Sequence, residues 1–306
     1  RGANKVYGML HGIQGLLQER YVDLDDHIKN DLDIELLKRT PSAYLGSCRF
    51  KLPDISKDRE IYDKIFDILN KMEIKYFFYI GGNDSMDTIK KLSDYSLLNG
   101  SDIRFMGVPK TIDNDLAATD HTPGYGSAAK YIGSITKEVI RDGLVYDQQN
   151  VTILEIMGRN AGWLTGAAAL AKCEDCEGPD MIFLPEVTFD VDEFMKKVAE
   201  LHKKKKSVVV AVSEGVKTAD GRYVCELTDG IDFVDAFGHK QLTGTARFLA
   251  EKINREVGCK TRAIEFNSLQ RCASHIVSRV DITEAYQVGG AAVKEAFEGE
   301  TGKMII

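Results

Sequence analysis

The chain has 306 residues, a formal net charge of −7, 43% hydrophobic residues and 28% charged residues. This composition is typical of a globular protein that can bury one large core or two modest ones. The longest basic run, "HKKKK" at 202–206, is more typical of a solvated helix end than of a nucleic-acid site, and no apolar run reaches the roughly 18–20 residues that span a bilayer. We therefore expect neither a nucleic acid nor a membrane as partner.

Six cysteines in a chain of this length do not indicate a disulfide framework. Cys173 and Cys176 form one C-x-x-C pair, but a structural zinc site usually needs a second pair, which the sequence lacks at matching spacing. Loop thiols are therefore favoured over a metal or redox site. The cysteine pattern predicts a cytoplasmic, reducing environment.

The two ends of the chain are unusual for a strand-rich fold. Residues 1–16 are interpreted as the tail of a helix, and the chain ends after a single short apolar run, "KMII". An α/β fold would normally start with a strand of its own. We therefore expect that both ends of the natural protein lie outside this sequence.

Short apolar runs rich in β-branched residues alternate with longer amphipathic stretches. The apolar runs predict buried parallel strands at 76–80, 103–109, 150–158, 181–186 and 207–215. The amphipathic stretches predict helices at 59–73, 86–100, 126–143, 161–173, 190–205 and 241–258. This alternation predicts an α/β fold with mainly parallel sheets, whose ligands lie beyond the carboxyl ends of the strands.

The first of these strands runs into a glycine turn and a helix, "YFFYIGGNDSMDTIKKL" at 76–92. A strand, a glycine turn and a helix N-terminus together form an anion site from backbone N–H groups and the helix dipole. Asp84 and Asp87, however, bring negative charge to the place where a phosphate would approach. The turn alone therefore leaves the ligand open.

The segment after the second strand, "GVPKTIDNDL" at 107–116, concentrates polar side chains in one loop. Two carboxylates one residue apart are common in Asx-type turns, which is the simpler interpretation. The neighbouring Lys110 and Thr111 favour a site instead. A carboxylate near a substrate hydroxyl can accept its proton, while a neighbouring carboxylate holds a metal.

Three later segments also place polar groups where strands are predicted to end. "EIMGRNAGW" at 155–163 contains Arg159, whose planar guanidinium suits phosphate recognition. "VSEG" at 212–215 offers one acid for a sugar hydroxyl, and "SLQR" at 268–271, with Arg262 upstream, offers two more guanidiniums. Taken together, the segments indicate a phosphate-bearing sugar, a metal and an acid placed for proton abstraction.

These segments together resemble the phosphofructokinase family. The matching pieces are "YLGSCRF", "IGGNDS", "PKTIDND", "TDHTPGYGSAAKYI", "EIMGRNAGW", "LPE", "SEG" and "LQR", in the family's order from about residue 44 to residue 271. The resemblance implies two Rossmann-like three-layer αβα domains. The donor domain would comprise residues 1–124 and 270–306, and the sugar-phosphate domain residues 125–269.

The resemblance also implies a reaction, phosphorylation of the 1-hydroxyl of fructose 6-phosphate with Mg²⁺ as cofactor. Asp113 would be the base, with Thr111, Lys110 and Arg159 as the other catalytic residues. Metal ligation would fall to Asp113 or Asp115, with Asn83 in the place of a metal-binding aspartate. The implied substrate-binding residues are Thr111, Ile112, Asp113, Asp115, Met157, Gly158, Arg159, Glu214, Arg262, Ser268 and Arg271.

Several positions depart from the ATP-using relatives and resemble the pyrophosphate-dependent branch. Asp84 and Lys110 stand where the ATP enzymes have glycines. A carboxylate at 84 would fill and charge the space that an adenosine needs, and a lysine at 110 would attract a compact, highly charged donor. The resemblance therefore implies reversible transfer from pyrophosphate, with donor-binding residues Gly81, Gly82, Asp84, Lys110 and Arg49.

Two alternatives to a pyrophosphate-dependent enzyme stay open. One is an ATP-dependent phosphofructokinase, and the other is a non-catalytic regulatory subunit that only binds sugar phosphate. In either case the resemblance implies a homodimer or homotetramer with a sugar site shared between subunits, because Arg262 would reach across from a neighbour.

Overall fold

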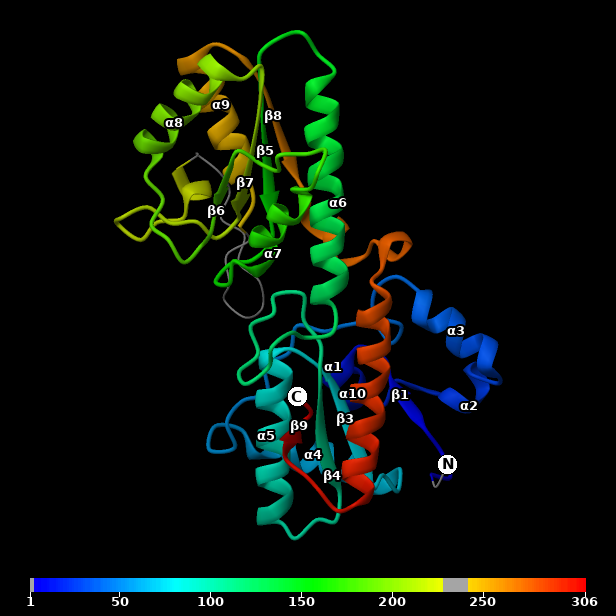
Figure 1. Ribbon diagram of the computed structural model, residues 1–306. Helices are drawn as coiled ribbons and strands as arrows, with labels where there is room; N and C mark the ends of the chain where they lie inside the picture. Colours follow the sequence, from blue (N-terminus) through cyan, green and yellow to red (C-terminus); the bar gives the residue numbers. More distant parts are fainter. Residues whose placement is uncertain (1–2, 228–241) are drawn as a thin grey trace.

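The computed structural model describes residues 3–227 and 242–306, and its elements form two groups, each built on its own parallel sheet (Figure 1). The predicted α/β fold with mainly parallel sheets is confirmed. The predicted division into two domains at residues 124 and 270 stays a prediction. No helix in the described ranges is long and apolar enough to cross a membrane.

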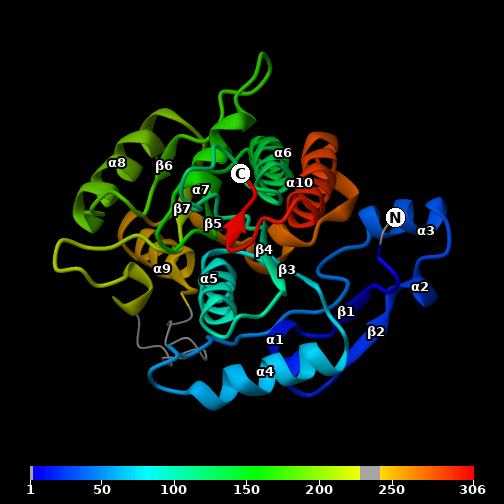
Figure 2. The same ribbon diagram turned by 90° about the horizontal axis from the view of Figure 1, so that it is seen from below.

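The first sheet has the strand order β3-β4-β9, formed by β3 (Tyr76–Gly81), β4 (Arg104–Pro109) and β9 (Lys303–Met304). Helices α4 (Arg59–Lys71) and α5 (Asn83–Leu98) pack on one face, where Phe105 is fully buried. Helix α10 (Arg279–Phe297) packs on the other face, against Met106 and Val108 (Figure 2). Successive residues of β4 thus point to opposite layers, as a strand buried on both faces requires.

The second sheet has the strand order β6-β7-β5-β8, with all neighbours parallel. Its strands are β5 (Asn150–Ile156), β6 (Met181–Phe183), β7 (Ser207–Ser213) and β8 (Lys260–Glu265). Val208, Val210 and Val212 pack under α8 (Val191–Lys204) and α9 (Thr245–Val257). Val209 and Ala211 face α6 (Tyr125–Leu144) and α7 (Trp163–Gly166), which gives three layers.

The opening of the chain differs from the expectation of a helix tail. It contains a strand, β1 (Tyr7–Met9), a turn, and a short helix, α1 (Gly12–Leu17), and β1 pairs antiparallel with β2 (Tyr21–Asp23). His11 and Gly12 adopt left-handed backbone angles, with φ of 61° and 57°, which break any continuous helix. A strand of three residues is too short for its period to be separated from a helical one.

Several other elements were not predicted or differ in form. Two small helices, α2 (Leu24–His27) and α3 (Asp31–Arg39), follow β2, and β8 and α10 lie in the last part of the chain. The predicted helix at 161–173 is α7 followed by a 3₁₀ turn at Ala167–Ala171. The first residue of the predicted helix at 241–258 lies outside the described residues.

Candidate functional site

The loop after β4 carries the predicted base, Asp113, and its conformation is fixed by its own side chains. The backbone N–H of Asp113 donates to the Thr111 hydroxyl at 3.1 Å, and the N–H of Lys110 donates to the Gly81 carbonyl at the end of β3 at 3.0 Å. Asn114 adopts a left-handed conformation with φ of 55°, which asparagine tolerates better than most residues. The loop therefore turns sharply at the carboxyl edge of the first sheet.

Asp113 lies where burial and charge oppose its ionisation. Burial raises the pKa of its carboxyl group and the neighbouring Asp115 raises it further, while Lys110, the Thr111 hydroxyl and Arg159 act in the opposite direction. Lys110 is affected in turn. Loss of hydration lowers the pKa of its amine, Asp113 raises it, and Arg271 and Arg49 lower it further. These mutual effects show that predicted residues from four separate segments form one electrostatic group.

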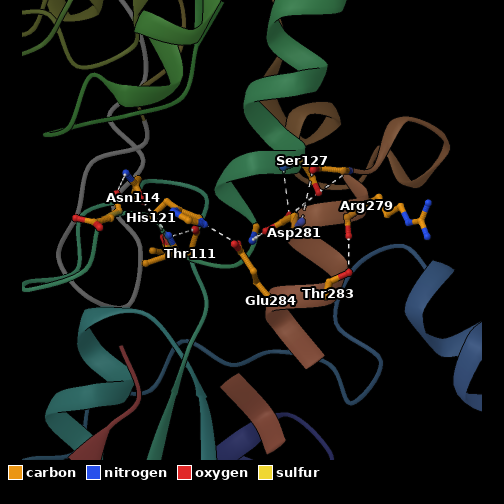
Figure 3. A network of polar contacts seen from close by, with 12 residues as sticks. Thr111, Asn114, His121, Ser127, Arg279, Asp281, Thr283 and Glu284 are labelled. Atoms are coloured by element: carbon orange, nitrogen blue, oxygen red, sulfur yellow. Dashed lines mark hydrogen bonds and ion pairs between the residues drawn. The ribbon is translucent and has the colours of Figure 1, made fainter. Parts of the chain in front are cut away.

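A second segment, residues 120–124, lies beside this loop and forms hydrogen bonds with it (Figure 3). The Thr122 hydroxyl donates to the Thr111 carbonyl at 2.8 Å, and the Thr111 N–H donates to the Pro123 carbonyl at 3.2 Å. The buried Asn114 accepts from the Thr122 N–H at 2.9 Å and donates to the Asp120 carbonyl at 3.2 Å. Asn114 is thus a supporting residue, and only its place in the loop could have indicated this role from the sequence.

The glycine turn after β3 begins α5 with Gly82 as its N-cap. A side chain at Gly81 would come within 2.0 Å of the Ser85 hydroxyl, so the position requires glycine. The Asn83 amide donates to the Asp115 carboxylate at 2.9 Å, which ties the two predicted metal-side residues together across the strand ends. Asp84 lies exposed in the first turn of α5. Its predicted role toward the donor stays a prediction.

The strands of the second sheet bring Met157, Gly158, Arg159 and Glu214 together. Glu214 follows β7, and its N–H donates to the Ile156 carbonyl at 2.9 Å, while its carboxylate accepts from the Gly158 N–H at 3.4 Å. Gly158 has φ of 135°, and a side chain there would lie 2.5 Å from the Ala161 carbonyl oxygen. A glycine is therefore needed for the turn that presents Arg159.

Glu214 is a second carboxylate with a displaced pKa. Burial raises its pKa to about 7, the Gly158 N–H and Arg159 partly offset this effect, and Asp113 adds to it. Because Asp113 raises the pKa of Glu214 although the two residues follow strands of different sheets, the carboxyl ends of the two sheets face the same site. This arrangement is the expected place for a ligand in an α/β fold.

The turn after β8 contains the predicted Arg271. It also contains Gln270, a supporting residue that was not predicted from the sequence. Arg271 lowers the pKa of both Lys110 and Glu214, so its charge lies near both strand ends. Ser268 lies exposed in the same turn. Gln270, which is 2% exposed, accepts from the Met157 N–H at 3.4 Å and donates to the Asn267 carbonyl at 3.0 Å. Gln270 supports the Met-Gly-Arg turn, and its only sequence signal was its place beside Arg271.

Arg262 is not brought together with the other predicted residues in this chain. It lies in the first half of β8, where its guanidinium bonds the Asp142 carboxylate at 3.0 Å and lies over the Tyr146 ring at 5.5 Å. Asp142 belongs to the last turn of α6. A role for Arg262 in a neighbouring subunit's site remains a prediction.

The donor atoms around Asp113 fit a magnesium ion. Asn83, Asp113 and Asp115 offer carboxylate and amide oxygens, which are the ligands that Mg²⁺ prefers. Over residues 3–227 and 242–306, no three His, Cys, Asp or Glu side chains form a metal-binding cluster. A site with one or two carboxylates suits Mg²⁺, because this ion is commonly held by substrate phosphates as well.

The C-x-x-C pair lies on a tight turn away from these residues. The N–H of each cysteine donates to the carbonyl of the other, at 2.9 and 3.2 Å. Both thiols are free, Cys173 exposed and Cys176 buried.

The chain is similar to known proteins over nearly its whole length. A family model described as "Phosphofructokinase" matches residues 1–296. The chain is 40% identical over 302 residues to the pyrophosphate–fructose 6-phosphate 1-phosphotransferase of Halomonas elongata, covering 98% of this chain and 71% of that protein. The protein of the same name from Rhodospirillum rubrum is 40% identical over 306 residues, covering 98% and 73%.

A solved structure shows the same fold. The pyrophosphate-dependent phosphofructokinase of Nitrosospira multiformis matches with a TM-score of 0.84 and 36% identity, over 97% of this chain and 69% of that chain. The predicted phosphofructokinase-like fold is therefore confirmed. The chain belongs to the phosphofructokinase family.

Proposed function

We propose that this protein transfers a phosphoryl group reversibly between pyrophosphate and the 1-hydroxyl of fructose 6-phosphate. The observation that carries this proposal is the position of Asp113, whose pKa responds to Lys110, Asp115 and Arg159 together. One acid thus lies among two cations and a second carboxylate, and cations so placed can stabilise the charge on a transferred phosphoryl group. The names of the relatives support pyrophosphate as the donor.

In the forward reaction the oxygen of the 1-hydroxyl forms a bond to a phosphorus atom of pyrophosphate. The bond from that phosphorus to the bridging oxygen breaks, and orthophosphate leaves. Asp113 accepts the hydroxyl proton, and its raised pKa makes its carboxylate a stronger base. Lys110 and Arg159 balance charge on the phosphoryl oxygens, and Mg²⁺, when bound, supplies further charge neutralisation.

The sugar would lie on the second sheet's side of the site. Glu214 and the Met157–Arg159 turn would hold its hydroxyl groups, and Arg271 would hold its 6-phosphate; the contact of Glu214 with the Gly158 N–H and the effect of Arg271 on its pKa support this assignment. Arg262 of a neighbouring subunit would complete the phosphate pocket in a homodimer or homotetramer. On the donor side, Asp84 would exclude a nucleotide, and Lys110 and Arg49 would attract pyrophosphate. We place the enzyme in the cytoplasm.

The test is turnover by the purified protein with fructose 6-phosphate, pyrophosphate and Mg²⁺. We expect fructose 1,6-bisphosphate and orthophosphate to form in equal amounts, and Asp113→Asn to lower kcat by about 10²–10⁴ because it removes the base. Glu251→Gln, which changes an exposed glutamate of α9, should leave kcat within about twofold. If the wild type binds fructose 6-phosphate tightly without turnover, the chain is a regulatory subunit and the proposal is wrong.

A further inference from the structure

The N-termini of two long helices from different parts of the chain meet beside the Asp113 loop. The N-cap residue of α6 is Gly124, which has no side chain that could cap the helix. The N-cap residue of α10 is Ser278, 154 residues later, and α10 carries Asp281 in its first turn. Figure 3 shows the Asp281 carboxylate directed at the start of α6.

Asp281 performs both tasks of a capping box for the other helix. Its carboxylate accepts from the N–H of Gly124 at 2.8 Å and from the N–H of Ser127, three residues on, at 3.2 Å. In an ordinary capping box these two N–H groups are satisfied by the side chains of two residues of the same helix. The Ser127 hydroxyl also donates to this carboxylate, and Asp281 is 7% exposed.

The sequence around Asp281 predicts a different, purely local role. "SRVD" at 278–281 is an S-x-x-acid pattern, in which the acid normally turns back to the N–H of the serine. Here the Ser278 N–H donates to the Ser127 hydroxyl at 3.1 Å instead. Each helix thus accepts a hydrogen bond from an N-terminal N–H group of the other. The Asp281 carboxylate caps α6 instead of its own helix, α10.

Gly124, which Asp281 holds, belongs to the support of the catalytic loop. It forms a parallel bridge with Thr111, and a side chain at Gly124 would lie 3.4 Å from the Thr111 carbonyl oxygen. Thr111 in turn accepts the N–H of Asp113 at 3.1 Å. The chain of contacts from Asp281 to Asp113 therefore has two intermediate residues, and each link is a backbone contact or a hydrogen bond.

We propose that Asp281 is a positioning residue for the phosphoryl-transfer loop, which it reaches through Gly124 and Thr111 without contacting substrate. It holds the first turn of α6 against α10, and so fixes where Thr111 and Asp113 lie relative to the residues of the second sheet. This inference rests on the proposed function for its kinetic consequence. Its structural consequence, a more mobile Thr111 segment when the carboxylate is altered, does not depend on turnover.

The test compares Asp281→Asn with Ser278→Ala. Asparagine keeps one oxygen for the Gly124 N–H but turns an NH₂ group toward the Ser127 N–H, so the capping of α6 is half lost. Ser278→Ala removes the hydroxyl that accepts from the Asp281 N–H at 3.5 Å and leaves the carboxylate on α6. Both variants remove a hydrogen bond near the start of α10. Only Asp281→Asn also disturbs the contacts that lead through Gly124 and Thr111 to Asp113.

Two measurements are made on the full chain. We expect Asp281→Asn to lower kcat by about 10-fold to 100-fold, as displacement of a reacting group by about 1 Å does, with KM for fructose 6-phosphate and pyrophosphate within about threefold. We also expect hydrogen exchange at the Thr111 and Gly124 amides to become at least about tenfold faster, since their partners are loosened. Ser278→Ala should change neither quantity by more than about twofold, whatever its melting temperature.

Ser127→Ala provides a second variant if Asp281→Asn does not fold, because it removes the hydroxyl that joins the two helix starts. It should accelerate exchange at Thr111 in the same direction. Equal loss of kcat in Asp281→Asn and Ser278→Ala would overturn the proposal, because it would indicate general destabilisation. Unchanged exchange at Thr111 in Asp281→Asn would also overturn it. If the wild type shows no turnover with any donor, the proposed function fails and the exchange measurement alone decides the positioning role.

Discussion

Two carboxyl groups at the site, Asp113 and Glu214, are kept from ionising easily by the same physical cause. Burial is the largest effect on the pKa of each, and neighbouring acids add to it. Their environments still differ. Asp113 has Lys110 nearby and a hydroxyl partner in Thr111, whereas Glu214 has the Gly158 N–H and Arg159. This difference supports the proposed division of labour, in which Asp113 accepts a proton and Glu214 holds the sugar.

The raised pKa of Glu214 predicts how sugar binding depends on pH. Its pKa of about 7 means that the carboxylate is largely present above pH 7 and is progressively neutralised below it. A neutral carboxyl group is a weaker acceptor for sugar hydroxyls, so KM for fructose 6-phosphate should rise as the pH falls from 8 to 6. Steady-state kinetics over this range checks the expectation.

Glu214→Gln is the matched variant for this measurement, since its side chain does not titrate. The phosphate of the substrate also titrates near pH 6, but it does so identically with both proteins. The difference between the two KM profiles therefore isolates Glu214. Parallel profiles would show that the Glu214 carboxyl does not contact the sugar in its ionised form.

At the scale of single residues, the sequence predicted the groups at strand ends and missed the groups that support them. Asp113, Arg159 and Glu214 were predictable because parallel strands present their carboxyl ends on one edge. Gln270 and Asp281 were not, because each acts through a backbone group remote in sequence. The pattern "SRVD" is typical of a local cap, and only the tertiary arrangement shows that Asp281 caps α6.

Among the elements, α9 depends on a buried acid that belongs to a strand. Glu155 of β5 is 4% exposed and accepts from the Ala246 N–H at 2.7 Å and the Gly244 N–H at 3.3 Å, at the start of α9. Burial raises its pKa to about 7, and Glu265 and Glu214 raise it further, while the two N–H groups lower it. The helix N-terminus favours the charge but does not fully compensate for its burial.

This raised pKa predicts a loss of stability with rising pH. The folded protein holds the proton more tightly than the unfolded chain, whose glutamate has an ordinary pKa of 4.5. The contribution of Glu155 is therefore fully present below pH 4.5 and is lost as the pH rises through about 7. Between pH 5 and pH 8 the free energy of unfolding should fall by about 1–3 kcal/mol on account of this group.

Urea unfolding of the wild type and Glu155→Gln at the two pH values measures this contribution, because glutamine cannot titrate. The free energy of unfolding of the wild type minus that of the variant should be larger at pH 5 than at pH 8. Glu251→Gln changes an exposed glutamate of α9 and serves as control. It should show no such trend. An equal difference at both pH values would contradict the expected titration of Glu155.

Long elements with a clear period were predictable, and short or unusual ones were not. β5 and β7 are buried along their whole length and appear in the sequence as continuous apolar runs. β1 has three residues, which is too few for a period, and it was interpreted as a helix. Helix α10 contains Gly289 and Gly290 in its interior, and glycine weakens any prediction of a helix.

For the whole molecule, the proposed site takes its residues from the loops of both sheets. The loop after β4 brings Lys110 and Asp113, and the turns after β5 and β7 bring Arg159 and Glu214. α10 and α6 meet at the boundary between the two groups of elements (Figure 1). The predicted assignment of the donor to the first sheet and the sugar to the second follows this arrangement and remains a proposal.

We propose that the choice between pyrophosphate and ATP depends on two residues on the first sheet's side of the site, Asp84 and Lys110. Asp84 lies at the start of α5, and Lys110 follows β4, whose end pairs with the end of β3. A carboxylate close to the α-phosphate of a nucleotide would repel it, whereas a lysine favours a small dense anion. Glycine at both positions should therefore weaken discrimination against ATP.

The most direct measurement is kcat/KM with pyrophosphate and with ATP, for the purified wild type and for Asp84→Gly with Lys110→Gly, at saturating fructose 6-phosphate and Mg²⁺. We predict that the wild type prefers pyrophosphate by about 100-fold or more, and that the double variant loses most of this preference. Lys90→Ala with Asp94→Ala, an exposed ion pair farther along α5, should keep the wild-type ratio. A wild type that prefers ATP, or a double variant with an unchanged donor ratio, would contradict this account of donor choice.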